Sequence, residues 1–140
     1  MTSFSVEQDI AAAPDRIWAI LTDAPRLVAG GLGVTRIEGV IRPGGRLKLW
    51  SEVSPNRAFS LRVAAFEPPA RMTWEGGMPL GLFKGVRTFT LAPMAGGTRF
   101  HMREEFSGAL AAMIVKSIPD LTPSFRKFAL GLKTLAETGS

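Results

Sequence analysis

Hydrophobic and polar residues alternate with a period of two along most of the chain, a pattern typical of strands that bury one face. Near the start, Phe4, Val6 and Ile10 alternate with polar neighbours. Further runs, separated by turns rich in proline and glycine, predict strands over 35–42, 46–54, 58–67, 86–92 and 98–107, with one more around residues 72–74. We expect Val53 to share an inward face with Leu47 and Leu49, and we expect residues 54–57 to form a turn.

The period changes to three and four residues in two regions, which predicts helices there. Pro14 and Asp15 suit the first turn of a helix that continues through Leu21, and we expect Pro25 to end it before one short further turn. After Gly108 an apolar face recurs at residues 110, 113, 114, 121, 125, 128, 132 and 135. Pro119 should break this stretch, which leaves a terminal helix over about Asp120–Glu137 with Asp120 or Thr122 as its cap.

This order of elements predicts a single α+β domain over residues 1–140. Consecutive strands with short connections are usually antiparallel neighbours, and the terminal helix is the one long amphipathic element available to cover their apolar face. We therefore expect the helix-grip fold, a curved antiparallel sheet of six or seven strands wrapped around the C-terminal helix. Such a sheet does not close tightly along the whole helix, so we also expect a cavity between the two.

Composition narrows the function classes. The 140 residues include no cysteine and a single histidine, His101. These counts exclude thiol catalysis and cysteine-ligated or multi-histidine metal sites, so we expect neither a metal nor a cofactor. The net charge of +5 is spread along the chain without a basic run, which argues against nucleic-acid binding. We expect no membrane span and, from the acidic residues near the start, no signal peptide, which favours a cytoplasmic protein.

Three motifs in this order carry a resemblance to a known family. They are the segment 13–18 (Ala-Pro-Asp-Arg-Ile-Trp) after the first strand, 96–99 (Gly-Gly-Thr-Arg) at the last hairpin, and 104–108 (Glu-Glu-Phe-Ser-Gly) before the terminal helix. Over nearly its whole length the chain resembles the SRPBCC superfamily, which includes START domains, birch-pollen-allergen-like proteins and the polyketide cyclase/dehydrase and lipid transport group. The resemblance implies the helix-grip fold. It leaves open whether the protein is a carrier of hydrophobic ligands, a receptor, a cyclase or a chaperone cofactor.

Glu104 is the sharpest candidate for a functional residue. It shares strand parity with Phe100, Met102 and Phe106, so its carboxylate should point inward, where a charge is costly unless it is paired. Arg87 on the preceding strand has the inward parity too, and a hairpin turning near residues 94–95 places it opposite or diagonal to Glu104. Three interpretations remain: a purely structural ion pair, an anchor for a ligand, or a catalytic group.

Apolar side chains that point inward surround this pair, and they form either a solid core or the wall of a pocket. The candidate ligand-binding residues are Arg87, Glu104, Trp74, Phe59, Phe89, Phe100, Met102, Phe106, Met113, Phe125 and Phe128. The hydrophobic segment Gly76–Gly85 is expected either to cover the pocket mouth as a flap or to fold down onto the sheet. The glycines at 30, 31 and 33 lack the context of a phosphate loop, and His101 has outward parity, so neither suggests a site.

Three functions compete. The first is binding of a hydrophobic small molecule, such as a lipid or a polyketide-like aromatic, between the sheet and the terminal helix. The second is a cyclase or dehydratase activity, which would need an acid–base pair that the inward residues barely supply. The third is a chaperone-cofactor-like interaction through the outer face around Trp50. We expect Trp50 to lie on that face, either in a weak homodimer contact or packed beneath a side chain such as Arg62.

Overall fold

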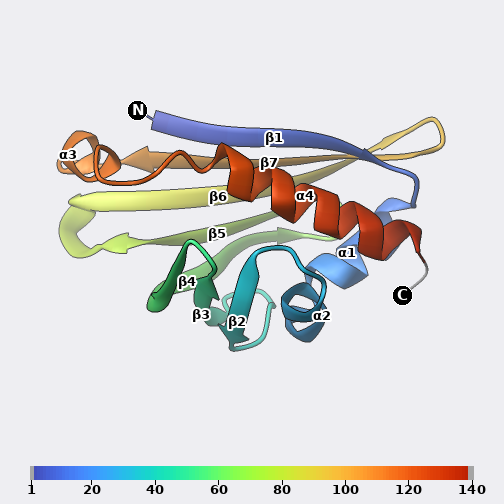
Figure 1. The fold of residues 1–140 in the computed structure, drawn as a ribbon, viewed down its shortest axis with the longest axis horizontal. Coiled ribbons are helices and arrows are strands. Elements are labelled where there is room, and N and C mark those ends of the chain that lie inside the picture. The colour runs from blue at the N-terminus through green and yellow to red at the C-terminus, as the bar shows by residue number, and fades with distance from the viewer. Residues whose placement is uncertain (1, 139–140) are drawn as a thin grey trace.

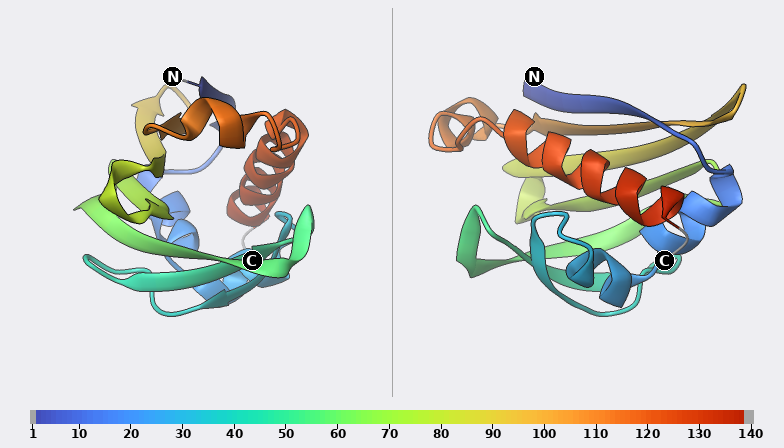
Figure 2. Two further views of the ribbon diagram at one scale, coloured as in Figure 1. Left: turned by 90° about the vertical axis from the view of Figure 1, so that its left-hand side faces the viewer. Right: turned by 45° about the vertical axis from the view of Figure 1, so that its right-hand side comes forward.

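A seven-stranded antiparallel sheet curls around the C-terminal helix in the computed structural model, which describes residues 2–138 (Figures 1 and 2). The strands lie in the order β1-β7-β6-β5-β4-β3-β2, so apart from β1 each strand is paired with its neighbour in the sequence. The predicted helix-grip fold is confirmed. The elements in chain order are β1 (Thr2–Ile10), α1 (Pro14–Leu21), α2 (Ala24–Ala29), β2 (Val34–Glu38), β3 (Arg46–Ser51), β4 (Ser54–Glu67), β5 (Arg71–Met78), the 3-10 turn η1 (Pro79–Gly81), β6 (Phe83–Met94), β7 (Gly97–Ser107), α3 (Ala111–Val115) and α4 (Thr122–Glu137).

The helices begin where the sequence signals place them, with one correction. Pro14 opens α1 as expected, but Pro25 lies in the first turn of α2 and does not end α1. Its missing amide donor is harmless in a first turn. The Asp23 side chain accepts a hydrogen bond from the Arg26 amide there. Before α4, the Asp120 carboxylate accepts one from the Thr122 amide at 3.0 Å, and this bond lowers the pKa of Asp120.

The core lies between the inner face of the sheet and helices α1, α2 and α4. Its members are buried hydrophobic side chains from all seven strands and from these three helices. The largest of them include Trp74, Phe89, Phe100, Phe125, Met72 and Met102. Three phenyl rings, those of Phe89, Phe100 and Phe128, lie with centroids 6.0–6.4 Å apart. The three rings are buried at 0–3% and form one aromatic cluster between β6, β7 and α4.

The loop from α2 to β2 docks on α4 because glycines leave it room. Leu32 is 2% exposed and fits against Gly131, where a Cβ would lie 2.7 Å from the Leu32 Cγ. A Cβ on Gly30 would lie 2.5 Å from the Leu135 Cδ1. The glycines at 30 and 131 therefore serve the close approach of a loop to a helix.

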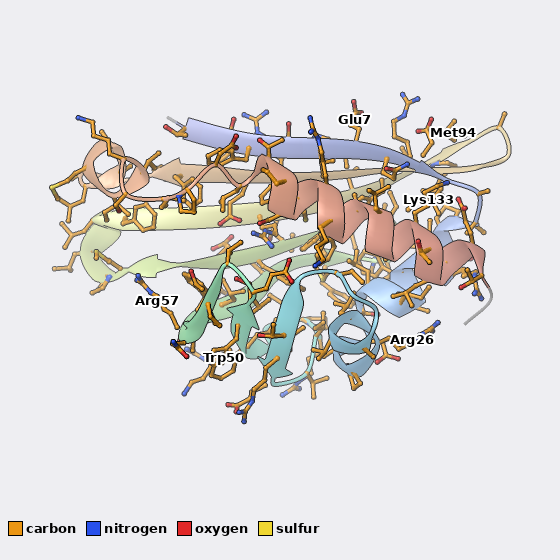
Figure 3. The ribbon with its side chains drawn as sticks, in the orientation of Figure 1. Glu7, Arg26, Trp50, Arg57, Met94 and Lys133 are labelled. Atoms are coloured by element: carbon orange, nitrogen blue, oxygen red, sulfur yellow. The ribbon has the colours of Figure 1, made fainter. Side chains whose placement is uncertain are left out.

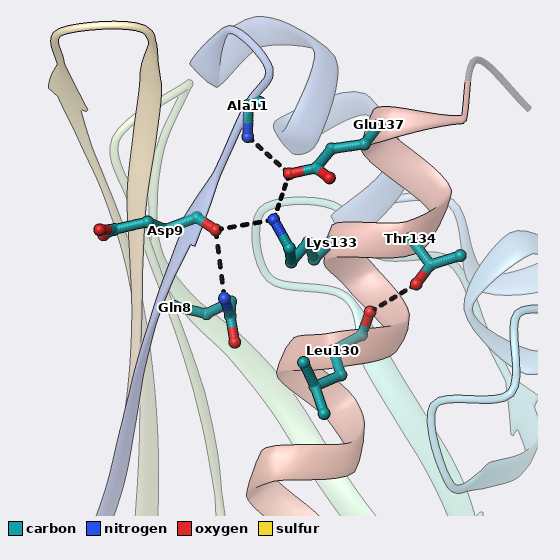
Figure 4. Close-up of polar contacts among 7 residues, drawn as sticks. All are labelled: Gln8, Asp9, Ala11, Leu130, Lys133, Thr134 and Glu137. Atoms are coloured by element: carbon teal, nitrogen blue, oxygen red, sulfur yellow. Dashed lines mark hydrogen bonds and ion pairs between the residues drawn. The ribbon is translucent and has the colours of Figure 1, made fainter.

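The C-terminal end of α4 is tied to the opposite end of the chain (Figure 4). Glu137 Oε2 accepts hydrogen bonds from the Ala11 amide at 2.7 Å and from Lys133 Nζ at 2.5 Å. Arg16 of α1 donates from Nε to the Ala136 carbonyl at 2.6 Å. Arg16 thereby satisfies a carbonyl that the end of a helix leaves without a partner.

The turn between β3 and β4 differs from the prediction. The chain reverses at residues 52–53, and β4 already begins at Ser54, because the pairing of β3 with β4 shifts register between Leu49 and Ser51. Val53 therefore lies in the turn, 49% exposed, and not on the inward face. Of the helices in the described residues, none combines the length and apolarity needed to cross a bilayer.

Candidate functional site

One row of side chains crosses the inner face of the sheet and contains its charged pair. Trp74 on β5 lies opposite Arg87 on β6, Arg87 lies opposite Glu104 on β7, and Glu104 lies opposite Phe4 on β1. Directly opposite residues of antiparallel strands share a face, so the inward prediction for Arg87 and Glu104 is confirmed. The hairpin that sets this register turns at residues 95–96.

Arg87 and Glu104 form a short, partly enclosed ion pair. Arg87 donates from Nε at 2.8 Å and from Nη2 at 2.6 Å, and both bonds end on Glu104 Oε1. The two side chains keep exposed fractions of 23% and 16%, so solvent reaches them from the inner face. The Arg87 guanidinium also lies 4.9 Å from the ring centroid of Phe125 on α4, a cation–π contact.

Trp74 adds a polar group that has no partner. Its side chain is 1% exposed, and its Nε1 is buried without a hydrogen-bond partner. Every other buried side-chain nitrogen or oxygen among the described residues has a partner. Leaving a buried donor unpaired costs free energy, and native proteins usually avoid it. Trp74 lies opposite Arg87 in the same row, and its N–H is enclosed by protein atoms in this structure.

Next to this row the inner face carries no side chains at two paired positions. Gly76 on β5 lies opposite Gly85 on β6, two residues from Trp74 and Arg87 and on the same face. A Cβ on Gly85 would lie 3.1 Å from Glu104 Oε2 and 3.3 Å from the Phe106 ring, and one on Gly76 would lie 2.7 Å from the Ser60 carbonyl oxygen. Both glycines thus leave room for neighbouring atoms that already pack against them. We call this pair of glycines the glycine floor.

Apolar side chains border the glycine floor, and they are less completely covered than the core. Phe59 lies opposite the buried Leu49 and so faces inward, yet it is 39% exposed, with the Arg57 guanidinium 5.4 Å from its ring centroid. Leu61, two residues on, is half-buried. Phe59 is exposed because α4 packs along β1, at the edge of the sheet farthest from β2, β3 and β4. An ion pair between Lys127 of α4 and Glu52 at 2.8 Å bounds this open side of the inner face.

The predicted ligand-binding residues therefore fall into three groups. Arg87, Glu104 and Trp74 come together with Phe125 at the row, and Phe59 and Phe106 flank the glycine floor. Phe89, Phe100, Met102 and Phe128 are buried at 0–3% in the closed part of the core. Met113 does not join them: it is 63% exposed on α3, which Pro119 and its neighbours separate from α4. The single apolar face expected over 110–135 is thus two helices with different surroundings.

Sequence reasoning missed the glycine floor and the open border. Gly76 and Gly85 stood at the two ends of a segment interpreted as a loop, although both lie within strands. Their even spacing from Trp74 and Arg87 was the signal that could have placed them on the inner face. The segment itself folds as a tight turn, and Phe83 stacks on Phe106 with ring centroids 5.6 Å apart.

The outer face carries Trp50, and the surface grooves lie away from the row. Trp50 points away from α4, as expected, but Arg36 and not Arg62 covers it, 5.0 Å from the ring centroid (Figure 3). The two grooves found in the structure lie outside the inner face, one between α4 and residues 30–31 and one between α2 and β2. Neither is the cavity expected between the sheet and the C-terminal helix, because side chains of the core fill much of that space. Among residues 2–138, no three His, Asp or Glu side chains are grouped to hold a metal ion.

Comparison with known proteins places this geometry in a family. Residues 1–137 match the family described as "Polyketide cyclase / dehydrase and lipid transport". No curated protein sequence matches the chain.

Solved structures with the same fold share little sequence with the chain. The protein MLL2253 from Mesorhizobium loti superimposes with a TM-score of 0.77 at 18% identity, and the alignment covers 99% of both chains. CV1439 from Chromobacterium violaceum gives a TM-score of 0.72 at 19% identity over 96% of both chains. The di-domain ARO/CYC StfQ of the steffimycin biosynthetic pathway gives 0.73 at 14% identity, covering 98% of this chain and 51% of that one. At these identities the likeness shows the fold alone.

Proposed function

Because the chain belongs to the polyketide cyclase/dehydrase and lipid transport family, we propose that it binds a hydrophobic small molecule on the inner face of its sheet. The ligand would lie beside the glycine floor, between the Trp74–Arg87–Glu104 row and the side chains of Phe59 and Leu61. The observation that carries the proposal is the unpartnered Nε1 of Trp74 beside a charged pair in an apolar wall. Ligand sites commonly combine mostly apolar walls with a few polar groups that fix orientation.

The polar groups suggest what the ligand presents to them. Trp74 Nε1 donates only, and an arginine guanidinium has five N–H donors and no acceptor. Two of those donors are used on Glu104 Oε1, which leaves others of Arg87 for a ligand oxygen. We therefore infer a largely apolar molecule with a ketone, phenol or carboxylate oxygen at one end, such as a polyketide-like aromatic or a fatty acid.

Binding assays with two probes test this proposal. Oleic acid and 1,8-dihydroxyanthraquinone represent the two ligand classes, and mass spectrometry of molecules extracted from the purified protein shows what it carries. Phe59→Ala should weaken binding about tenfold, because the ring gives up its apolar contact with the probe. Val53→Ala is the matched control, since Val53 is comparably exposed but lies in the turn. If neither probe binds and the protein is reproducibly empty, the proposal is wrong.

A catalytic role is the second candidate, and it would rest on Glu104. Glu104 is the one acidic residue among the inward positions of β4 to β7. Both hydrogen bonds from Arg87 end on its Oε1, so its Oε2, which lies next to Gly85, is not used by Arg87. In that position it could accept a proton from a bound ketone-bearing chain. Glu104→Gln separates the two roles: a pure binding protein keeps its probe affinity within a few-fold, whereas a cyclase loses turnover while still binding.

A further inference from the structure

Two segments at one end of the molecule expose an unusual number of large apolar side chains. The turn between β5 and β6 and the short helix α3 lie together at the left-hand end of Figure 1. The Leu110 amide donates to the Leu82 carbonyl at 2.8 Å and joins them. A Cβ on Gly108 would lie 2.7 Å from the Gly81 and Leu82 carbonyl oxygens, so a glycine is needed for this approach. We call residues 78–84 and 110–118 the apolar tip.

The exposed side chains of the apolar tip are those of Met78 (47%), Leu80 (95%), Leu82 (38%) and Met113 (63%). Leu80 is the extreme case. Its backbone has φ 62° and ψ 22°, in the left-handed region that is costly for a leucine. A polar residue or glycine would suit both the solvent and that conformation better, so folding alone does not account for a leucine here.

The charges of the apolar tip are all of one sign. Residues 76–86 and 107–119 contain Lys84 and Lys116 but no aspartate or glutamate. Glu75 pairs with Lys84 at 3.4 Å, so Lys116 is the lysine of the apolar tip that forms no ion pair with the described residues. The next acidic residue along the chain, Asp120, accepts a hydrogen bond from the Thr122 amide and keeps its charge. Arg57, near the start of β4, lies toward the same end of the molecule (Figure 3).

From these observations we propose that the apolar tip docks on the surface of a bilayer that contains anionic lipids. Apolar side chains that project from a turn and a short helix, with Lys116 beside them, match the boundary between headgroups and acyl chains. A second protein copy fits less well. The two segments hold fewer residues than the roughly 20–30 per side of a stable protein interface. The proposal does not depend on a ligand at the inner face.

Flotation with vesicles tests the proposal on the full chain. We expect binding to vesicles of phosphatidylcholine and phosphatidylglycerol (3:1) and much weaker binding to phosphatidylcholine alone. The double variant Leu80→Asn with Met113→Gln should lose about tenfold or more of the affinity for the anionic vesicles. Asparagine tolerates a positive φ, so this variant should fold with an unchanged or raised melting temperature. Val40→Asn, at a residue 65% exposed on the β2–β3 loop, is the matched control and should bind like the wild type.

Charge and insertion are tested separately. Lys116→Gln should weaken binding about fivefold, while Lys48→Gln, an exposed lysine on the outer face of β3, should have a smaller effect. Because the chain has no cysteine, Leu80→Cys can be labelled with an environment-sensitive dye, whose emission should shift to the blue with anionic vesicles. The same dye at Val40→Cys should not respond.

Three outcomes would overturn the proposal. Wild-type protein that fails to float with the anionic vesicles is the first. Equal binding by the Leu80→Asn, Met113→Gln variant is the second, since it would reduce the interaction to the general positive charge of the protein. The third is a dimer in sedimentation velocity that this variant abolishes, because it would assign the apolar tip to a second copy of the chain.

Discussion

The Arg87–Glu104 pair is held by sheet register, and its environment lies between a surface pair and a fully buried one. A surface ion pair contributes about 0–1 kcal/mol, whereas losing one partner of a fully buried pair costs about 3–5 kcal/mol. The exposed fractions of 23% and 16% place this pair between those limits. Its apolar surroundings raise the cost of leaving either charge alone.

A double-mutant cycle measures that cost. We expect Arg87→Met or Glu104→Leu alone to lower the free energy of unfolding by about 2–4 kcal/mol. The double variant should lose much less than the sum, since neither charge is then left unpaired. Chemical denaturation of the four proteins gives the coupling energy. Single variants within about 0.5 kcal/mol of the wild type would mean that both groups are effectively solvated.

At the residue scale, the sequence predicted which face Arg87, Glu104, Phe59 and Trp50 occupy, though not that of Val53, and it did not predict what covers them. Strand parity and a hairpin turn were enough to bring Arg87 opposite Glu104. Parity also placed Phe59 inward, but its exposure depends on the path of α4, which a strand pattern does not contain. The same limit applies to Trp50, whose cover comes from Arg36 on the short neighbouring strand β2 and not from Arg62 on β4.

At the element scale, α4 is positioned by close packing at one glycine and by polar ties at its end. Gly131 lets Leu32 of the α2–β2 loop contact the helix backbone. Glu137 and Arg16 hold its C-terminal turn against the start of α1. These contacts set the helix along β1, and on the inner face of β4 they leave Phe59 exposed while Val63 is fully buried.

Gly131→Ala tests the packing contact. Alanine is the better helix former by about 1 kcal/mol, but its Cβ would lie 2.7 Å from the Leu32 Cγ, and overpacking costs about 1–3 kcal/mol. We expect a net loss of about 1 kcal/mol in the free energy of unfolding. Leu130→Ala, at the neighbouring exposed position, should change it by less than about 0.5 kcal/mol. A more stable Gly131→Ala protein would show that Leu32 moves aside at no cost.

The Glu137 tie should depend on pH. The hydrogen bond from the Ala11 amide, and then that from Lys133, lower the pKa of Glu137 below its usual value of 4.5. A lowered folded-state pKa stabilises the fold fully above the unfolded-state pKa and loses this effect as pH falls through the folded-state pKa. Glu137→Gln should therefore be less stable than the wild type near pH 7, and the difference should shrink below about pH 4.5. Melting curves from pH 7 to pH 3 measure it, and a difference independent of pH would contradict the proton linkage.

The order and type of the elements were predictable from the sequence. The period of two in strands, the period of three to four in helices, and the prolines and glycines at turns all indicated the same elements. Element ends were less predictable where pairing is irregular. The shift of register between Leu49 and Ser51 moved the start of β4 into a predicted turn. The segment 110–135 kept one apolar period across Pro119, and the split into α3 and α4 left Met113 on the surface.

At the scale of the whole molecule, the interior divides into a closed core and a partly open inner face. Stacked phenyl rings close the region between β6, β7 and α4, while the glycine floor and Phe59 border the open region. The sequence predicted the fold in which a helix covers one face of a curved sheet. It did not predict which part of that face stays exposed, because this depends on how far α4 reaches over the sheet.

The most direct test of the proposed site is the indole region of an amide-correlated NMR spectrum during titration with whichever probe binds. The three tryptophans give three indole signals, assigned by single Trp→Phe variants. Binding beside the glycine floor should shift the Trp74 indole N–H, because it gains a hydrogen-bond acceptor, and should leave Trp50 on the outer face unchanged. Saturating binding that leaves Trp74 unmoved, with the perturbed signals on the outer face or in the groove beside α4, would contradict the site proposed here.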